Sequence, residues 1–176
     1  IIQFYDYFGD IIMNDYYHYI FEEMAMNDMI QHCDIQDNHN ILEIGPGSGY
    51  LAELILKKYD LHYIGIDVSK TMSLASSKRL QKYMNSNKNH NNNNYNKKKN
   101  IELHLTNNTI SLLESWKYPV NRYIFTYVLD LLPNHEIEQF STMLTEKLKE
   151  SQSSKVCIIN LTYGFTPLSR IITNIW

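Results

Sequence analysis

The chain has 176 residues and a mass of 20.8 kDa, enough for a single domain that buries about 70% of its unfolded surface. Hydrophobic residues make up 44% of the sequence and charged residues 20%, which excludes a wholly disordered protein. With 16 basic and 19 acidic residues the net charge is −3, so a protein that coats nucleic acid is excluded and no nucleic-acid partner is expected.

The predicted elements alternate between helices and strands along the chain. Helices are predicted at residues 11–30, 50–58, 70–84, 110–115 and 135–149. Strands are predicted at residues 41–45, 62–67, 101–105, 122–129 and 155–161. Ser48 is a candidate cap for the second helix. This alternation predicts a parallel sheet with helices on both faces, within one domain that spans residues 1–176.

One segment differs from the rest in composition. From Asn85 to Asn100 the sequence reads NSNKNHNNNNYNKKKN and contains no aliphatic residue. Such a tract cannot bury enough surface to offset its ordering entropy, so we predict a disordered, low-complexity insertion in a surface loop. A basic patch at residues 97–99 that contacts an anion is the alternative interpretation.

The two cysteines, Cys33 and Cys157, are too few for a disulfide framework, and neither lies in a metal-ligand pair. We therefore expect a reducing compartment, with Cys157 as a buried, inert thiol in an apolar strand. No run of eighteen apolar residues occurs, so no membrane span is expected. The chain starts at Ile1 without a signal-peptide pattern, and we expect a cytoplasmic protein whose start is trimmed.

The most informative stretch is ILEIGPGSGYL at residues 41–51, which predicts a strand, a loop and the start of a helix. The loop contains Gly45, Pro46, Gly47 and Gly49. Glycines permit a positive φ and close approach of a ligand, and the helix start offers unpaired N–H groups. Asp67 ends the next predicted strand, where a carboxylate can accept hydrogen bonds from both ribose hydroxyls of an adenosine ligand.

Two adenosine cofactors fit this unit. A dinucleotide needs GxGxxG, whereas the spacing here is GxGxG, and the third glycine of the dinucleotide pattern would fall on Tyr50. Glu43 precedes Gly45 by two residues, and a carboxylate there suits a positively charged ligand better than a diphosphate. The charge argument favours S-adenosylmethionine over NAD, although an NAD-type oxidoreductase stays open.

The chain resembles class I S-adenosylmethionine-dependent methyltransferases from about Phe4 to Trp176. Four segments carry the resemblance: ILEIGPGSGYLAELIL, IGIDVSKTMSLASSKRL, YIFTYVLDLLPNHEI and INLTYGFTPLSRIITNIW. The resemblance implies a doubly wound, Rossmann-like α/β fold with strand order 3-2-1-4-5. It also implies methyl transfer from S-adenosylmethionine to a small-molecule acceptor. No catalytic base is assigned, because one is needed only where the acceptor must lose a proton.

The resemblance also implies roles for individual residues. Asp67 would hold the ribose, while Val68 and Met72 would flank the adenine. Asn107, beside Asn108, stands where the family commonly has an Asp for the adenine amino group. An Asn still offers a carbonyl oxygen, so recognition is weakened rather than lost.

Some other positions depart from the family pattern, and others have no role that the sequence assigns. Tyr127 follows the fourth strand, where ligands bind in open α/β sheets. Val120 and Asn121 stand where the family usually has an aromatic residue and an Asp. These departures keep open a non-catalytic binding or regulatory domain of methyltransferase fold. The cluster before the first strand matches no standard metal spacing, and no metal site is expected there: His32, Cys33, Asp34, Asp37 and His39.

The last two strands of the family's seven-stranded sheet have no counterpart before Trp176. The fifth strand is therefore expected to form an exposed apolar edge. We expect either self-association through that edge or a native protein that extends beyond Trp176.

Overall fold

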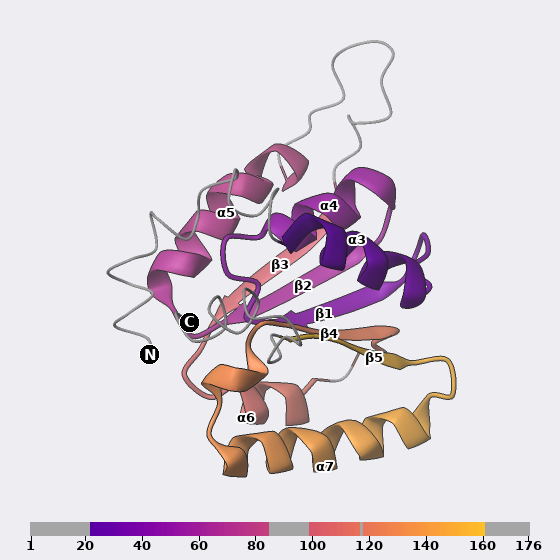
Figure 1. Cartoon of the computed structure of the whole chain (residues 1–176), viewed down its shortest axis with the longest axis vertical. Helices are drawn as coiled ribbons and strands as arrows, with labels where there is room; N and C mark the ends of the chain where they lie inside the picture. The colour runs from indigo at the N-terminus through magenta and orange to yellow at the C-terminus, as the bar shows by residue number, and fades with distance from the viewer. Residues whose placement is uncertain (1–21, 85–98, 117, 161–176) are drawn as a thin grey trace, which may run out of the picture.

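Five parallel strands form the centre of the molecule (Figure 1). The computed structural model describes residues 22–84, 99–116 and 118–160. The strands are β1 (Asn40–Ile44), β2 (His62–Asp67), β3 (Asn100–Leu105), β4 (Arg122–Thr126) and β5 (Lys155–Ile159). They pair in the order β3-β2-β1-β4-β5, and every pairing is parallel. The predicted Rossmann-like fold and its strand order 3-2-1-4-5 are confirmed.

Helices cover both faces of the sheet (Figure 1). One face carries α3 (Glu23–His32), α4 (Tyr50–Lys58) and α5 (Lys70–Met84). The other carries α6 (Thr109–Glu114) and α7 (Asn134–Glu150), and a short 3₁₀ helix, Leu129–Leu131, links β4 to α7. No helix in the described part of the chain is long and apolar enough to cross a bilayer.

The central strands contribute to two hydrophobic cores, one on each face. Ile41 and Ile124 pack with α3, α4 and α5, whereas Leu42, Ile44 and Phe125 pack with α6 and α7. Because a parallel strand is buried on both sides, its apolar residues run continuously rather than alternating with polar ones. That is why the short run ILEI identified β1 in the sequence.

Several predicted boundaries are wrong. Ser48, the predicted cap of α4, does not cap the helix. The capping residue is Gly49, with φ of 76°, and no side chain caps the helix. β4 ends at Thr126 rather than at residue 129, because Tyr127 takes a φ of 53° that a strand cannot continue. β5 ends at Ile159, and residue 161 lies outside the described residues.

Two further predictions fall partly outside the described residues. For the predicted first helix, residues 11–21 lie outside them, and α3 matches the remainder. For the Asn-rich tract, residues 85–98 lie outside them, but the last two residues of the tract are placed in the structure. Asn100 begins β3 and pairs with His62, and Lys99 Nζ donates to the carbonyl of Tyr59 at 2.7 Å. The prediction of disorder is therefore wrong for these last two residues.

The two cysteines form a disulfide, which corrects the prediction of an inert thiol at Cys157. Cys33 follows α3 and Cys157 lies in β5, with Cα atoms 6.2 Å apart and both residues buried. The partners are separated by 124 residues in sequence, so only the tertiary packing of α3 beside β5 brings them together. Because the two cysteines are bonded to each other, they no longer support the prediction of a reducing compartment. For the same reason Cys33 has no free thiolate to bind a metal.

β5 lies at one end of the described sheet, where β4 is its paired neighbour. Cys157 faces the core, while Ile158 is 55% exposed. The strand thus presents an apolar side chain at an edge, the arrangement on which the expected self-association depends. Self-association itself stays a prediction.

Candidate functional site

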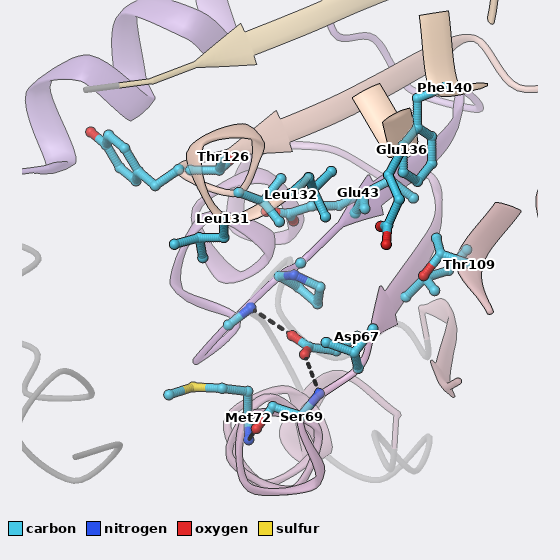
Figure 2. A pocket seen from close by; sticks show the side chains of 18 of the residues that line it. Glu43, Asp67, Ser69, Met72, Thr109, Thr126, Leu131, Leu132, Glu136 and Phe140 are labelled. Atoms are coloured by element: carbon cyan, nitrogen blue, oxygen red, sulfur yellow. Dashed lines mark hydrogen bonds between the residues drawn. The ribbon is translucent and has the colours of Figure 1, made fainter. Parts of the chain in front are cut away.

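A cavity of about 760 Å³ lies at the carboxyl ends of the central strands. It is lined by the loops that follow β1, β2, β3 and β4, by the start of α7 and by residues of α3 (Figure 2). This is the edge at which open α/β sheets bind ligands, because the connections there diverge to opposite faces of the sheet. The volume is in the range of small-molecule sites.

The glycine loop between β1 and α4 forms one wall of this cavity. Gly45, Gly47 and Gly49 all have positive φ, but their surroundings differ. A Cβ atom on Gly45 would lie 2.8 Å from Val128 Cγ2, and one on Gly49 would lie 3.0 Å from Ser76 Cβ. A Cβ atom on Gly47 would meet nothing within 4 Å. Gly45 and Gly49 are therefore required by packing, whereas Gly47 borders open space.

Asp67, at the end of β2, joins the glycine loop to the loop that follows β2 (Figure 2). Its Oδ2 accepts from Gly47 N–H at 3.2 Å, and its Oδ1 accepts from Ser69 N–H at 2.8 Å. Ser69 Oγ in turn accepts from Met72 N–H in the first turn of α5. The carboxylate is buried in the protein and lines the cavity. Val68 and Met72 line it too, Val68 being the more exposed.

Glu43, in β1, is a buried carboxylate beneath the glycine loop and is 1% exposed. The Tyr63 hydroxyl donates to its Oε2 at 2.6 Å. Burial raises the pKa of Glu43 to about 7, and the Tyr63 hydrogen bond opposes that rise. A cationic ligand in the cavity would therefore favour the ionised form of this group.

The carboxyl end of β4 contributes two unusual features. Tyr127 has a positive φ of 53°, uncommon for a residue with a side chain, and its N–H donates to the carbonyl of Ile159 at 2.8 Å. Thr126 Oγ1 is buried and makes no hydrogen bond of normal geometry within the described residues, but its hydroxyl faces Glu43 and lowers the pKa of that carboxyl. Both residues line the cavity. A strained residue at the edge of a cavity is typical of a ligand site.

The loop after β3 brings Asn107 and Asn108 to the cavity. Asn108 Oδ1 accepts from Ser111 N–H at 3.0 Å and so caps α6. Its side chain is therefore already engaged. Asn107 is exposed and makes no side-chain hydrogen bond within the described residues, so it is the better candidate of the two for contact with a ligand.

All candidate site residues of the sequence prediction except Gly49 line this single cavity. Gly49 instead packs against Ser76 in α5. Sequence reasoning missed Met26 of α3 with the preceding Glu22, Thr126 of β4, and the start of α7. At α7 the lining residues are the capping Pro133 and, within the helix, His135, Glu136, Gln139 and Phe140. For Thr126 a signal existed, since it is a polar residue that ends the apolar run YIF.

The charges around the cavity are of one sign. Among its described lining residues are four carboxylates and neither a lysine nor an arginine; the acids are Glu22, Glu43, Asp67 and Glu136. A diphosphate would meet this acidic lining with no cationic side chain to bind it.

Comparison with known families identifies the chain. Residues 4–141 match the family model described as protein-L-isoaspartate (D-aspartate) O-methyltransferase (PCMT). The chain belongs to this methyltransferase family. No match was found among the curated proteins. The predicted resemblance to methyltransferases is confirmed.

Solved structures share the fold of this chain at low identity. The Bacillus subtilis YcgJ protein matches with a TM-score of 0.56 and 15% identity over 87% of this chain and 57% of its own. A SAM-dependent methyltransferase from Aquifex aeolicus gives a TM-score of 0.56 and 14% identity over 90% and 73%. One from Thiobacillus denitrificans, in complex with S-adenosyl-L-homocysteine, gives 0.58 and 10% over 84% and 53%. This chain thus spans little more than half the length of some of these proteins.

Proposed function

We propose that this protein transfers a methyl group from S-adenosylmethionine to a small-molecule acceptor bound in the same cavity. The observation that carries the proposal is an acidic cavity built on a glycine loop, without a lysine or arginine in its described lining. S-adenosylmethionine carries a sulfonium and an ammonium but no phosphate, so it suits such a lining. NAD carries a diphosphate and does not.

The residues present fit this cofactor. Gly47 borders open space, so a ligand can approach its backbone closely. Asp67 would hold the ribose, and Val68, Met72 and Asn107 would surround the adenine. Glu43, Thr126 and Tyr127 would hold the methionine part, since they offer a buried carboxylate, a buried hydroxyl and a strained backbone at the cavity.

When bound, the cofactor supplies a methyl group already activated by its sulfonium. The chain's own task is then to orient the two reactants and to exclude water. Leu131, Leu132 and Phe140 supply an apolar wall for this purpose (Figure 2). Acidic side chains on the other walls favour the positive charge of the reacting centre.

Calorimetric titration tests the proposal directly. We expect S-adenosylhomocysteine to bind and NADH not to bind. Binding of NADH alone would favour an oxidoreductase, and binding of neither would reject the cofactor site. Transfer of labelled methyl groups to an acceptor library would then separate an enzyme from a domain that binds cofactor without turnover.

Asp67→Ala is expected to weaken S-adenosylhomocysteine binding by ~10- to 150-fold, since a hydrogen bond to a charged group is worth about 1.5–3 kcal/mol. The variant also loses the acceptor for Gly47 N–H and Ser69 N–H, so a lower melting temperature is expected as well. Titration well below that temperature separates the two effects. An unchanged dissociation constant would remove Asp67 from the proposed site.

A further inference from the structure

Glu136 differs from the other carboxylates of the cavity because the described chain leaves it unpaired. Glu43 accepts a hydrogen bond from Tyr63, and Asp67 accepts hydrogen bonds from two backbone N–H groups. Glu22 is not without a partner either. The Glu136 side chain makes no hydrogen bond or ion pair within the described residues and is partly buried. Figure 2 shows its carboxylate pointing from α7 into the cavity.

The start of α7 explains why this carboxylate is not turned back onto its own helix. Glu136 is the third residue of α7, the position from which a glutamate normally reaches back to the N–H of the capping residue. Here the capping residue is Pro133, which has no N–H. The side chain therefore has no such partner and is available to a ligand.

The surroundings of Glu136 favour one kind of ligand. Leu132 and Phe140 make the nearby wall apolar, and Thr109 adds a neutral hydroxyl (Figure 2). A partly buried carboxylate without a cationic partner is unfavourable, and a positively charged ligand removes that penalty. Glu136 is not among the residues assigned above to the cofactor, which leaves it available to the acceptor.

We propose that the methyl acceptor carries a positively charged amine that binds to Glu136. The inference rests on the proposed function and names the acceptor class for the same cavity. It concerns binding, and the ammonium held by Glu136 need not be the atom that is methylated.

A carboxylate acceptor, as in the printed description of the family, fits this cavity poorly. The N-terminus of α7 attracts an anion, but Glu136 already supplies the negative charge in that first turn. An acidic acceptor would thus meet Glu136 with no lysine or arginine in the described cavity lining to offset it.

Three ring probes of matched size test the acceptor class: benzylamine, benzyl alcohol and benzoate. Each is titrated at pH 7 and low salt into the protein, with and without saturating S-adenosylhomocysteine. We expect benzylamine to bind about 10-fold more tightly than benzyl alcohol, and benzoate to bind most weakly. Equal affinities, tighter benzoate binding or no binding of any probe would overturn the proposal.

The variant Glu136→Gln is compared with Glu138→Gln, an exposed position on the same helix. Glu136→Gln should abolish the preference for benzylamine and leave S-adenosylhomocysteine binding unchanged, whereas Glu138→Gln should alter neither. A preference that survives Glu136→Gln would overturn the proposal. If the unmodified protein does not bind S-adenosylhomocysteine, the proposed function is rejected. The probe titrations without S-adenosylhomocysteine would still decide which class of ligand binds to Glu136.

Discussion

Gly47→Val is expected to abolish binding of S-adenosylhomocysteine while the protein stays folded. The new side chain would meet no protein atom near its Cβ, so it would extend into the space that the ligand needs. A φ of 54° at this position adds a backbone penalty of roughly 1–2 kcal/mol for any residue with a Cβ. Together these effects predict a loss of affinity on the order of 100-fold or more.

Two control variants separate bulk from strain. Gly47→Ala carries the same backbone penalty with less bulk, so it should retain more affinity than Gly47→Val. Gly45→Ala places its Cβ 2.8 Å from Val128 Cγ2, a contact inside the protein, and should mainly lower the melting temperature. If Gly47→Val is folded by circular dichroism and binds normally, the glycine loop is not the cofactor site.

The fold could be predicted because its signals are local. The bounds of β2 and α5 agree with the prediction, since HYIGID is an apolar run that stops at an acid, and the helical spacing continues to residue 84. The glycine loop and Asp67 also lie close together in sequence, on either side of one helix and one strand. Short-range patterns of this kind indicate which segments form helices and strands and which side of each element is buried.

What could not be predicted depends on partners far apart in sequence. The link between Cys33 and Cys157 requires α3 to pack beside β5, and no pattern around either cysteine indicates that. The cavity-facing position of Glu136 similarly requires α7 to lie against the loop after β3. An amphipathic period predicts that α7 has a buried face but not which of its first residues borders a ligand site. Tyr127 illustrates a third limit, since its sequence favours a strand and its φ ends one.

Arg122 is the clearest buried charge that the sequence did not reveal. It begins β4, is 3% exposed and donates to four backbone carbonyls. The acceptors are Cys33, Asp34 at 2.6 Å, Asn121 at 2.7 Å and Ser153 at 3.1 Å. The guanidinium thereby joins the segment after α3 to the amino ends of β4 and β5.

Arg122→Ala is expected to lower the free energy of unfolding by about 3 kcal/mol, because it removes four hydrogen bonds from a charged donor, one of them to the carbonyl of buried Cys33. Arg122→Lys should recover part of the loss, since an ammonium cannot reach all four acceptors at once. Asp34→Asn is the control. The Asp34 carboxylate is exposed and lies 3.4 Å from the guanidinium, so little change is expected. Urea unfolding without reductant measures all three variants while the disulfide stays constant.

The position of Arg122 separates this effect from that of Gly47. Arg122 lies at the amino ends of the strands, whereas the cavity lies at their carboxyl ends. Arg122→Ala should therefore leave the affinity of the folded protein for S-adenosylhomocysteine unchanged. Gly47→Val should lower that affinity strongly and cost less stability than Arg122→Ala does. A loss of affinity in folded Arg122→Ala would mean that the segment after α3 transmits its position to Glu22 and Met26 in the cavity wall. A loss of stability below about 1 kcal/mol would show instead that water replaces the guanidinium at those carbonyls.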